Sequence, residues 1–200
     1  MRENFLYWGN DADAYFDAAD EGTDRAIKLI EDFIGEVPIK DYGTIIDLGC
    51  GRGRFAKYLR SKCDNVIAVD VNEENLIRLA GNKYYKDLRQ NDGKDIPTFS
   101  EVVDFVFCYD AMVHFDLDVV ISYLQETYRV LRTGGTAFFH HSNIITSQTD
   151  IMKNPHCRNC MNKYLFSYLA KHAGLQVVKQ EMITWAGIED LDCFTLLRKA

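Results

Sequence analysis

The fold follows from one ten-residue stretch, Ile45-Ile46-Asp47-Leu48-Gly49-Cys50-Gly51-Arg52-Gly53-Arg54. Its first residues are apolar enough for a buried strand, and glycine then occupies every other position before a helix. Because glycine lacks a Cβ atom, this turn can adopt positive φ angles and let a ligand lie against the main chain. The spacing is G-x-G-x-G and not the G-x-G-x-x-G of dinucleotide sites. The stretch therefore predicts a nucleotide-like ligand at a strand-to-helix turn of an α/β sheet.

A second acidic residue supports this interpretation. The apolar run from Val66 to Val69 is followed directly by Asp70. Since neighbouring parallel strands end at the same sheet edge, the carboxylate of Asp70 would stand beside the glycine turn. In that place it can accept hydrogen bonds from both hydroxyls of a ribose. The alternative is an ordinary tight turn in which Asp70 is a helix N-cap.

The composition is that of an acidic globular chain. Its 200 residues carry a net charge of -7 and have a pI near 5.2, which argues against binding to nucleic acid or to an anionic membrane. Six cysteines are scattered without a small-domain framework, no apolar run has the length of a membrane span, and the amino terminus lacks a signal-peptide core. We therefore expect reduced thiols, a cytoplasmic location and a small-molecule partner.

Apolar periodicity and turn residues divide the chain into alternating elements. Strands are predicted over residues 44–48, 66–69, 83–86, 102–108, 136–140, 176–181 and 192–198, and helices over 23–35, 54–62, from 73 onward, 117–131 and 163–172. Gly134 and Gly135 are expected to end the fourth of these helices. The pattern predicts an α/β, Rossmann-like doubly wound sheet of seven mostly parallel strands, with one antiparallel strand near the C-terminus. We expect a single domain over residues 1–200.

Two segments fall outside this rhythm. Residues 142–162 form a long connection without a clear element, which predicts a substrate loop at the carboxyl edge of the sheet. Residues 1–22 are expected to act as an N-terminal lid.

Cys157 and Cys160 beside His156 could bind zinc, but a structural zinc site normally needs a second pair of ligands, so we predict no metal.

From Thr44 to Lys199 the chain resembles the class I S-adenosylmethionine-dependent methyltransferases, most specifically in the segment from Asp47 to Gly53. The resemblance implies that S-adenosyl-L-methionine is the cofactor and S-adenosyl-L-homocysteine the product. It places Asp47 near the ammonium group of the cofactor, Asp70 on the ribose and Val71 against the adenine. The full set of cofactor-binding residues that it implies is Asp47, Gly49, Cys50, Gly51, Asp70, Val71, Asp92, Gly93 and Tyr109.

The segment from Cys108 to Phe115 resembles the Asp-Ala-x-x-His segment of phosphoethanolamine N-methyltransferases, whose histidine works with an amino-terminal tyrosine. We therefore expect His114 to be the general base and Tyr15 its partner. An ammonium with a pKa of about 10.4 must lose a proton before it attacks, and a histidine with a pKa of about 6.5 can accept that proton. The alternatives are that His114 caps or packs the next helix and that Tyr15 is a core aromatic.

Polar residues near the same edge suggest how an acceptor is held. Asp110 could attract an amine cation or cap a helix, and Arg158 could make a forked contact with an anionic group. Because strand residues alternate between faces, one of His140 and His141 points away, and we expect His141 to face the site. The predicted substrate-binding residues are Tyr7, Asp110, His141, Asn143, Arg158, Lys163 and Tyr164. A solvated loop is the alternative for the cluster around Arg158.

These observations predict a methyltransferase that acts on a small molecule. The leading hypothesis is N-methylation of a phosphorylated amine such as phosphoethanolamine. An O-methyltransferase acting on a sugar or polysaccharide precursor is the close alternative. A protein that binds S-adenosylmethionine without transferring its methyl group is the alternative from another class.

Overall fold

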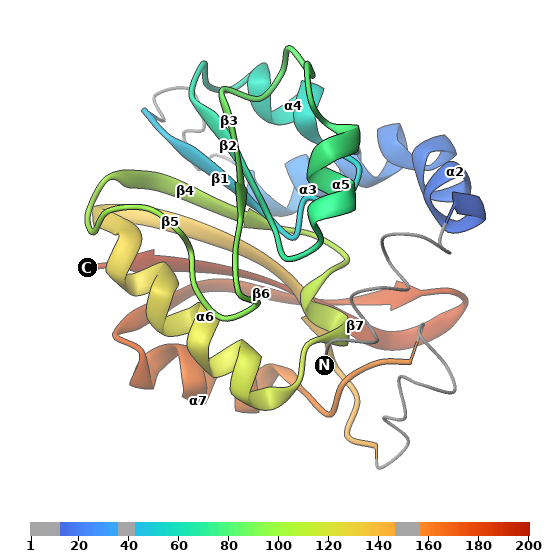
Figure 1. The fold of residues 1–200 in the computed structure, drawn as a ribbon. Helices are drawn as coiled ribbons and strands as arrows, with labels where there is room; N and C mark the ends of the chain where they lie inside the picture. Colours follow the sequence, from blue (N-terminus) through green and yellow to red (C-terminus); the bar gives the residue numbers. More distant parts are fainter. Residues whose placement is uncertain (1–12, 36–42, 147–156) are drawn as a thin grey trace.

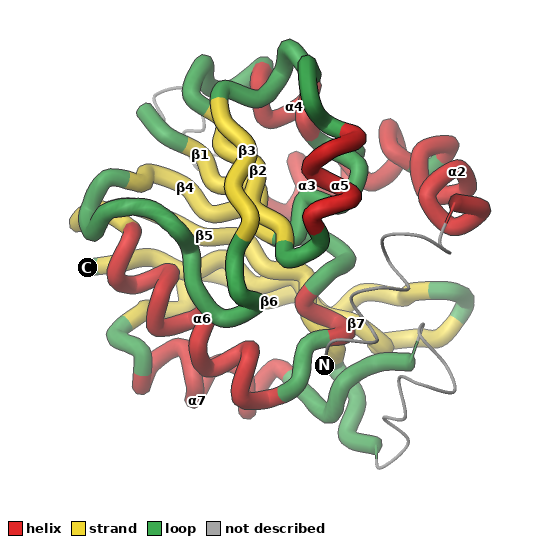
Figure 2. Tube along the Cα trace, in the orientation of Figure 1, coloured by secondary structure: helices red, strands yellow, loops and turns green. Residues whose placement is uncertain are grey.

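The computed structural model describes residues 13–35, 43–146 and 157–200, with side chains from Phe16 onward. Within these ranges the chain forms one twisted sheet with helices on both faces (Figures 1 and 2). The strands are β1 (Ile45–Leu48), β2 (Val66–Asp70), β3 (Asp87–Gln90), β4 (Val103–Cys108), β5 (Leu131–Ser142), β6 (Leu175–Trp185) and β7 (Ile188–Lys199). The helices are α2 (Asp13–Glu21), α3 (Thr23–Ile34), α4 (Ala56–Arg60), α5 (Glu73–Arg78), the 3₁₀ helix η2 (Met112–His114), α6 (Leu117–Val130) and α7 (Lys163–His172).

The sheet has the strand order β3-β2-β1-β4-β5-β7-β6. Strands β3, β2, β1, β4 and β5 run parallel to one another, and β7 is antiparallel to both β5 and β6. This confirms the predicted Rossmann-like sheet with one antiparallel strand. The direction in which strands are added reverses at β1: β2 and β3 are added on one side of β1, and the chain then returns to place β4 on the other side. Ligands of open α/β sheets bind beside such a switch point, at the carboxyl ends of the strands.

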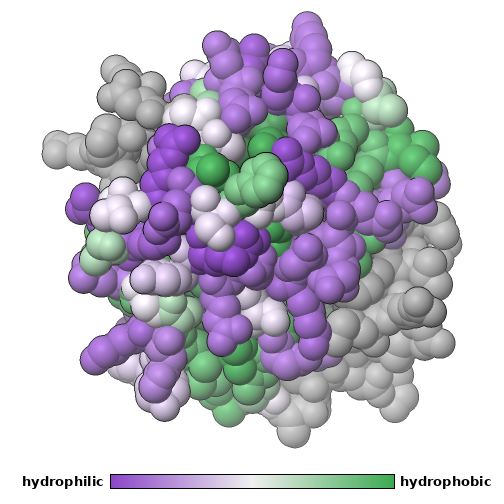
Figure 3. Space-filling model, turned by 60° about the vertical axis from the view of Figure 1, so that its left-hand side comes forward, coloured by the Kyte–Doolittle hydropathy of each residue, from purple (hydrophilic) through white to green (hydrophobic). Residues whose placement is uncertain are grey.

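Each sheet face has its own core. Ile45 of β1 packs on the side of α3 and α4, and Ile46 packs on the side of α6 and α7. All positions of β1 and β2 are buried, as expected for central parallel strands covered on both faces. The molecular face in Figure 3 is largely hydrophilic, with hydrophobic residues in small separate groups. Among the described residues, no helix is both long and apolar enough to cross a membrane.

Three predicted boundaries were wrong. The third strand occupies Asp87–Gln90 and not residues 83–86, where the Tyr85 hydroxyl instead donates to Asp47 of β1. The Gly134-Gly135 pair lies inside β5, at a register shift between β4 and β5, and α6 ends earlier. The last hairpin is also longer than predicted. Its two-residue turn, Ala186-Gly187, has positive φ at both positions (50° and 79°), the geometry that favours tight hairpins.

Candidate active site

The glycine turn is held against the end of β2. The backbone N–H groups of Gly49 and Cys50 both donate to the carbonyl of Val69, at 2.8 and 3.2 Å. Gly49 has a φ of 70°, and a Cβ atom there would lie 2.7 Å from the Cβ of Ala111. Glycine is therefore required at this position by conformation and by space. The turn is a fixed part of the sheet edge.

Asp70, the last residue of β2, connects the glycine turn to the segment that follows β2. Its Oδ2 accepts a hydrogen bond from the Gly51 N–H and its Oδ1 accepts one from the Asn72 N–H, both at 2.8 Å. Asp70 is 8% exposed, and burial raises the pKa of its carboxyl group although these hydrogen bonds lower it. Each carboxylate oxygen has two lone pairs, so Asp70 can still accept hydrogen bonds from a ligand.

Asp47 is a second buried carboxyl group beneath the turn. Its Oδ2 accepts a hydrogen bond from the hydroxyl of Tyr85. Burial raises the pKa of Asp47 to about 7, the Tyr85 hydrogen bond opposes this rise, and the charge of Asp70 adds to it. A positive charge brought here would therefore be stabilised by a carboxylate that is poorly solvated.

The residues fit the cofactor implied by the sequence. A ligand with an ammonium group and ribose hydroxyls would supply the cation and the hydrogen-bond donors that suit Asp47 and Asp70. Val71 is half-buried beside Asp70. The side chain of Asp92 accepts hydrogen bonds from the N–H groups of Lys94 and Asp95, which folds the turn that contains the buried Gly93. The cofactor roles of these residues stay predictions.

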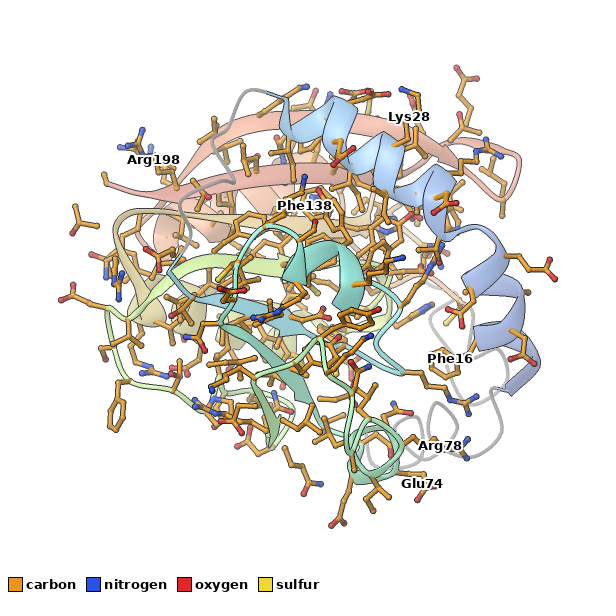
Figure 4. All side chains as sticks on the ribbon, turned by 90° about the horizontal axis from the view of Figure 1, so that it is seen from above. Phe16, Lys28, Glu74, Arg78, Phe138 and Arg198 are labelled. Atoms are coloured by element: carbon orange, nitrogen blue, oxygen red, sulfur yellow. The ribbon has the colours of Figure 1, made fainter. Side chains whose placement is uncertain are left out.

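Helix α2 lies over the glycine turn. The ring of Phe16 would be 3.0 Å from a Cβ atom at Gly51, and the guanidinium of Arg52 lies 4.4 Å from the centroid of the same ring. Figure 4 shows Phe16 on the side of α2 that faces the rest of the molecule. Tyr15 precedes Phe16 in α2, but its side chain lies outside the described part of the chain, and so does all of Tyr7. Their predicted roles stay untested.

His114, the predicted base, is buried in η2 (7% exposed). Its Nδ1 lies 2.9 Å from the carbonyl oxygen of Cys157. A carbonyl can only accept, so Nδ1 carries the proton, and Nε2 is then the nitrogen of the neutral ring that can take up another proton. This geometry suits a general base. It also shows that the return end of the predicted substrate loop contacts His114.

Both histidines of β5 are 0% exposed, and His141, the one expected to face the site, lies on the other side of the sheet. His141 is completely buried on the α6 and α7 side, stacked on Phe166 at 3.9 Å. Its two ring nitrogens pair with the Ser142 carbonyl and the Thr195 hydroxyl, and burial lowers its pKa to about 3. His140 points to the opposite face, where Tyr109 lies, because strand residues alternate.

Arg158 does not present an unpaired charge to the site, in contrast to our expectation. Its Nε and Nη2 donate to Oδ1 and Oδ2 of Asp192, at 2.8 and 2.7 Å. Burial acts to raise the pKa of Asp192, but hydrogen bonds from His140 and Arg158 outweigh it, so the pKa lies below its ordinary value. Asp192 has no counterpart among the residues predicted for the site. Its only sequence signal is an acidic residue between apolar neighbours in a strand.

Three other residues predicted to bind the substrate, Asn143, Lys163 and Tyr164, lie around α7 and the last hairpin. Asn143 donates to the carbonyl of Asp190 and accepts from the N–H of Lys163, which fixes the end of β5. Tyr164 is 74% exposed on α7, and the ammonium of Lys163 lies over its ring. The structure thus gives Asn143 a structural contact and places Tyr164 on the molecular surface.

Aromatic and charged residues meet beside the end of β4. Tyr109 lies 4.9 Å from the ring of His140 and 6.0 Å from that of Trp185, measured between centroids. The guanidinium of Arg54 lies 5.6 Å from the Tyr109 centroid. Asp110 follows with a φ of 56°, and its N–H donates to Nδ1 of His140 at 3.2 Å. The sequence did not indicate Trp185 or Arg54, because the hairpin was predicted too short and Arg54 was interpreted only as a helix start.

The described residues contain no cluster of three or more His, Cys, Asp or Glu side chains that could hold a metal ion. His156 lies outside the described ranges.

Comparison with known proteins agrees with this geometry. Residues 46–139 match the family described as a methyltransferase domain. A methyltransferase of Claviceps purpurea (strain 20.1) is 39% identical over 100 residues, covering 48% of this chain and 30% of the relative. A malonyl-[acyl-carrier protein] O-methyltransferase of Pectobacterium atrosepticum is 31% identical over 96 residues, covering 48% of this chain and 37% of the relative. The match therefore spans about a third of the length of these relatives.

A solved structure shows that the likeness in fold extends over nearly the whole chain. A SAM-dependent methyltransferase of Leishmania major superposes with a TM-score of 0.77 and 15% identity, covering 98% of this chain and 82% of that one. At this identity the likeness concerns the fold alone. It includes the C-terminal strands that lie beyond the family match.

Proposed function

We propose that this chain is an S-adenosylmethionine-dependent methyltransferase that acts on a small molecule. The observation that carries the proposal is the pair of buried carboxyl groups, Asp47 and Asp70, on either side of a glycine turn at the switch point of the sheet. The methyltransferase-domain match over residues 46–139 contains all of these residues. Both lines of support concern the same edge of the sheet.

When bound, the cofactor would supply an electrophilic methyl group. The residues of this chain would hold the donor and the acceptor in line, which is the main requirement of a displacement reaction. Asp47 would neutralise the ammonium group, and Asp70 would hold the ribose. Nε2 of His114 would take the proton from an acceptor nitrogen or oxygen, directly or through water.

The residues expected to contact the methyl acceptor fit a small amine better than a substrate that is recognised through a phosphate group. Tyr109 and Trp185 are neighbouring aromatic rings, and the charge of Asp110 is close enough to act on Tyr109. The carboxylate of Asp110 would attract a cation. Each ring already has a guanidinium nearby, that of Arg54 5.6 Å from the Tyr109 centroid and that of Arg158 5.8 Å from the Trp185 centroid. Arg158, the cation that we expected for a phosphate, is already neutralised by Asp192. We therefore propose N-methylation of an amine. Phosphoethanolamine and substrates with a hydroxyl acceptor are the alternatives that the experiment below compares with it.

The test offers labelled S-adenosylmethionine with ethanolamine, phosphoethanolamine, a catechol and a sugar nucleotide, and calorimetry measures binding of S-adenosylhomocysteine. We expect binding, and transfer of label to an amine whether or not it carries phosphate. Transfer only to the catechol or the sugar nucleotide would replace the amine with a hydroxyl acceptor. Binding without any transfer would favour the non-catalytic alternative, and absence of binding would contradict the whole proposal. Asp87→Asn, on the exposed edge strand β3, is the matched control for variants of Asp47 and Asp70.

A further inference from the structure

Three consecutive residues near the end of the predicted substrate loop, Cys157-Arg158-Asn159, connect two parts of the site. We call them the return segment. Cys157 and Asn159 contact η2, whereas Arg158 contacts β7. Because residues 157 and 159 bind on one side and residue 158 on the other, the segment lies between the two.

On one side the return segment holds η2. The N–H of Asn159 donates to the carbonyl of Val113 at 2.8 Å. Its side-chain amide donates to the carbonyls of Met112 and Phe115, at 3.0 and 2.6 Å. With the Cys157 carbonyl on Nδ1 of His114, these contacts fix both the backbone of η2 and the ring of the candidate base.

On the other side Arg158 binds Asp192 with two parallel hydrogen bonds, the geometry that gives a guanidinium and a carboxylate a defined orientation. The Asp192 side chain is 0% exposed and that of Arg158 is 10% exposed. Oδ2 of Asp192 also lies 3.0 Å from Nε2 of His140. Trp185 is adjacent, with the guanidinium of Arg158 5.8 Å from its ring centroid.

His140 links Asp192 to Asp110 through hydrogen bonds at its two ring nitrogens. Its Nδ1 accepts the N–H of Asp110, so this nitrogen has no proton, and Nε2 must be the one that donates to Asp192. Asp110 has a φ of 56°, a conformation that a residue other than glycine adopts at a cost in backbone energy. The hydrogen bond from its N–H to His140 helps to hold it there.

We propose that Asp192 is a positioning residue of the acceptor site. Through Arg158 it holds the return segment and hence His114, and through His140 it holds Asp110. One buried carboxylate thus sets the distance between the candidate base and the residues beside Tyr109. The inference rests on the proposed function, because it concerns the alignment of an acceptor with that base. The contacts themselves do not depend on it.

The test variant is Asp192→Asn. The carboxylate accepts from Arg158 on both oxygens and from His140 on Oδ2, whereas an amide offers one acceptor and turns a donor toward another donor. Asp190→Asn is the matched control, since Asp190 is exposed on the same hairpin. Trp185 is one of only two tryptophans, so Trp8→Phe makes it the sole reporter.

We expect Asp192→Asn to change the Trp185 emission and to lower kcat/KM for the acceptor found in the panel by about ten- to a hundredfold, as small misplacements of a reacting group do. The affinity for S-adenosylhomocysteine should stay within about twofold of the parent, because Asp192 and the return segment are not among the residues predicted to bind the cofactor. Arg158→Gln should have the same effect, and Arg158→Lys should recover part of it by restoring the charge. Equal behaviour of Asp192→Asn and Asp190→Asn would overturn the proposal.

A measurement on the unaltered protein separates this inference from the proposed function. Nitrogen-15 spectra of the histidines should show His140 with its proton on Nε2 and His114 with its proton on Nδ1. The opposite tautomer at His140 would refute the proposal, whether or not the protein transfers methyl groups. The spectra, together with Arg158→Gln, also decide the case if Asp192→Asn fails to fold.

Discussion

Lowering the pH from 7 to 6 should weaken cofactor binding through Asp47. The pKa of this carboxyl group is about 7 in the free protein, so roughly half of it is ionised at pH 7 and roughly one tenth at pH 6. If only the carboxylate pairs with the ammonium group, affinity should fall about fivefold, or about 1 kcal/mol. The sign follows from the pair: a bound cation lowers the pKa of Asp47, so binding releases a proton and strengthens as pH rises.

Calorimetry with S-adenosylhomocysteine between pH 6 and pH 7 measures this linkage directly. Below pH 7 an α-amino group, with a pKa of about 7.7 to 8.0, stays mostly charged, so the slope reports the protein. Repeating the titration in two buffers with different heats of ionisation counts the released protons. Asp47→Asn keeps an acceptor for the Tyr85 hydroxyl and should remove the slope. Tyr85→Phe removes a hydrogen bond that lowers the pKa of Asp47, so the midpoint should move to higher pH.

The reasoning fails if the parent protein shows no slope over this range. It fails also if Asp47→Asn retains the full slope, because the titrating group would then be another one. Asp70 is the nearest candidate, since burial raises its pKa too.

Four further changes test other parts of the structure. His114→Ala should lower turnover by about a hundredfold to ten-thousandfold while calorimetry shows unchanged cofactor affinity; a loss of only a few fold would make its role packing. Asp70→Ala should weaken S-adenosylhomocysteine binding by about 1.5 to 3 kcal/mol for each ribose hydrogen bond lost, measured by calorimetry. Gly53→Ala should destabilise the fold more than Gly81→Ala in urea titrations: both have positive φ, but only at Gly53 would a Cβ meet a neighbour, Leu79, at 2.8 Å. Because its folded pKa is lowered, Asp192 should contribute stability above about pH 4 that is lost as the pH falls further, and Asp192→Asn should lack this part of the acid sensitivity.

The parts of the structure that sequence reasoning predicted are local in the chain. The glycine turn and the acidic residue after β2 were identified because each depends on a few consecutive residues. The antiparallel hairpin at the C-terminus was expected for the same reason, although its length was underestimated. The edge strand β3 was misplaced because Asp87–Gln90 is mostly polar and half-exposed, whereas Tyr84-Tyr85 nearby has the composition of a strand.

The contacts that sequence reasoning missed join residues far apart in the chain. Asp192 meets His140 across 52 positions, and Asn159 meets Met112 across 47. No local pattern encodes such a pair, because each residue alone has several ordinary explanations. Arg158 shows the consequence. A basic and polar cluster in an acidic chain suggested an anion-binding site around Arg158, but in the structure the charge of Arg158 is already paired with the carboxylate of Asp192 in β7.

The misassignment of the two histidines has a specific physical cause. In a strand exposed on one face, alternation of polar and apolar residues reveals which side chains point inward. Residues 136–142 of β5 are buried on both faces, and Phe138 and Phe139 precede the two histidines, so hydrophobicity does not tell which histidine points to which face. The register supplies it: Phe138 pairs with Phe107, so the next residue on that face after Phe138 is His140, which meets Tyr109. Only the pairing of β4 with β5 therefore determines that His140, and not His141, connects the candidate site to Asp192.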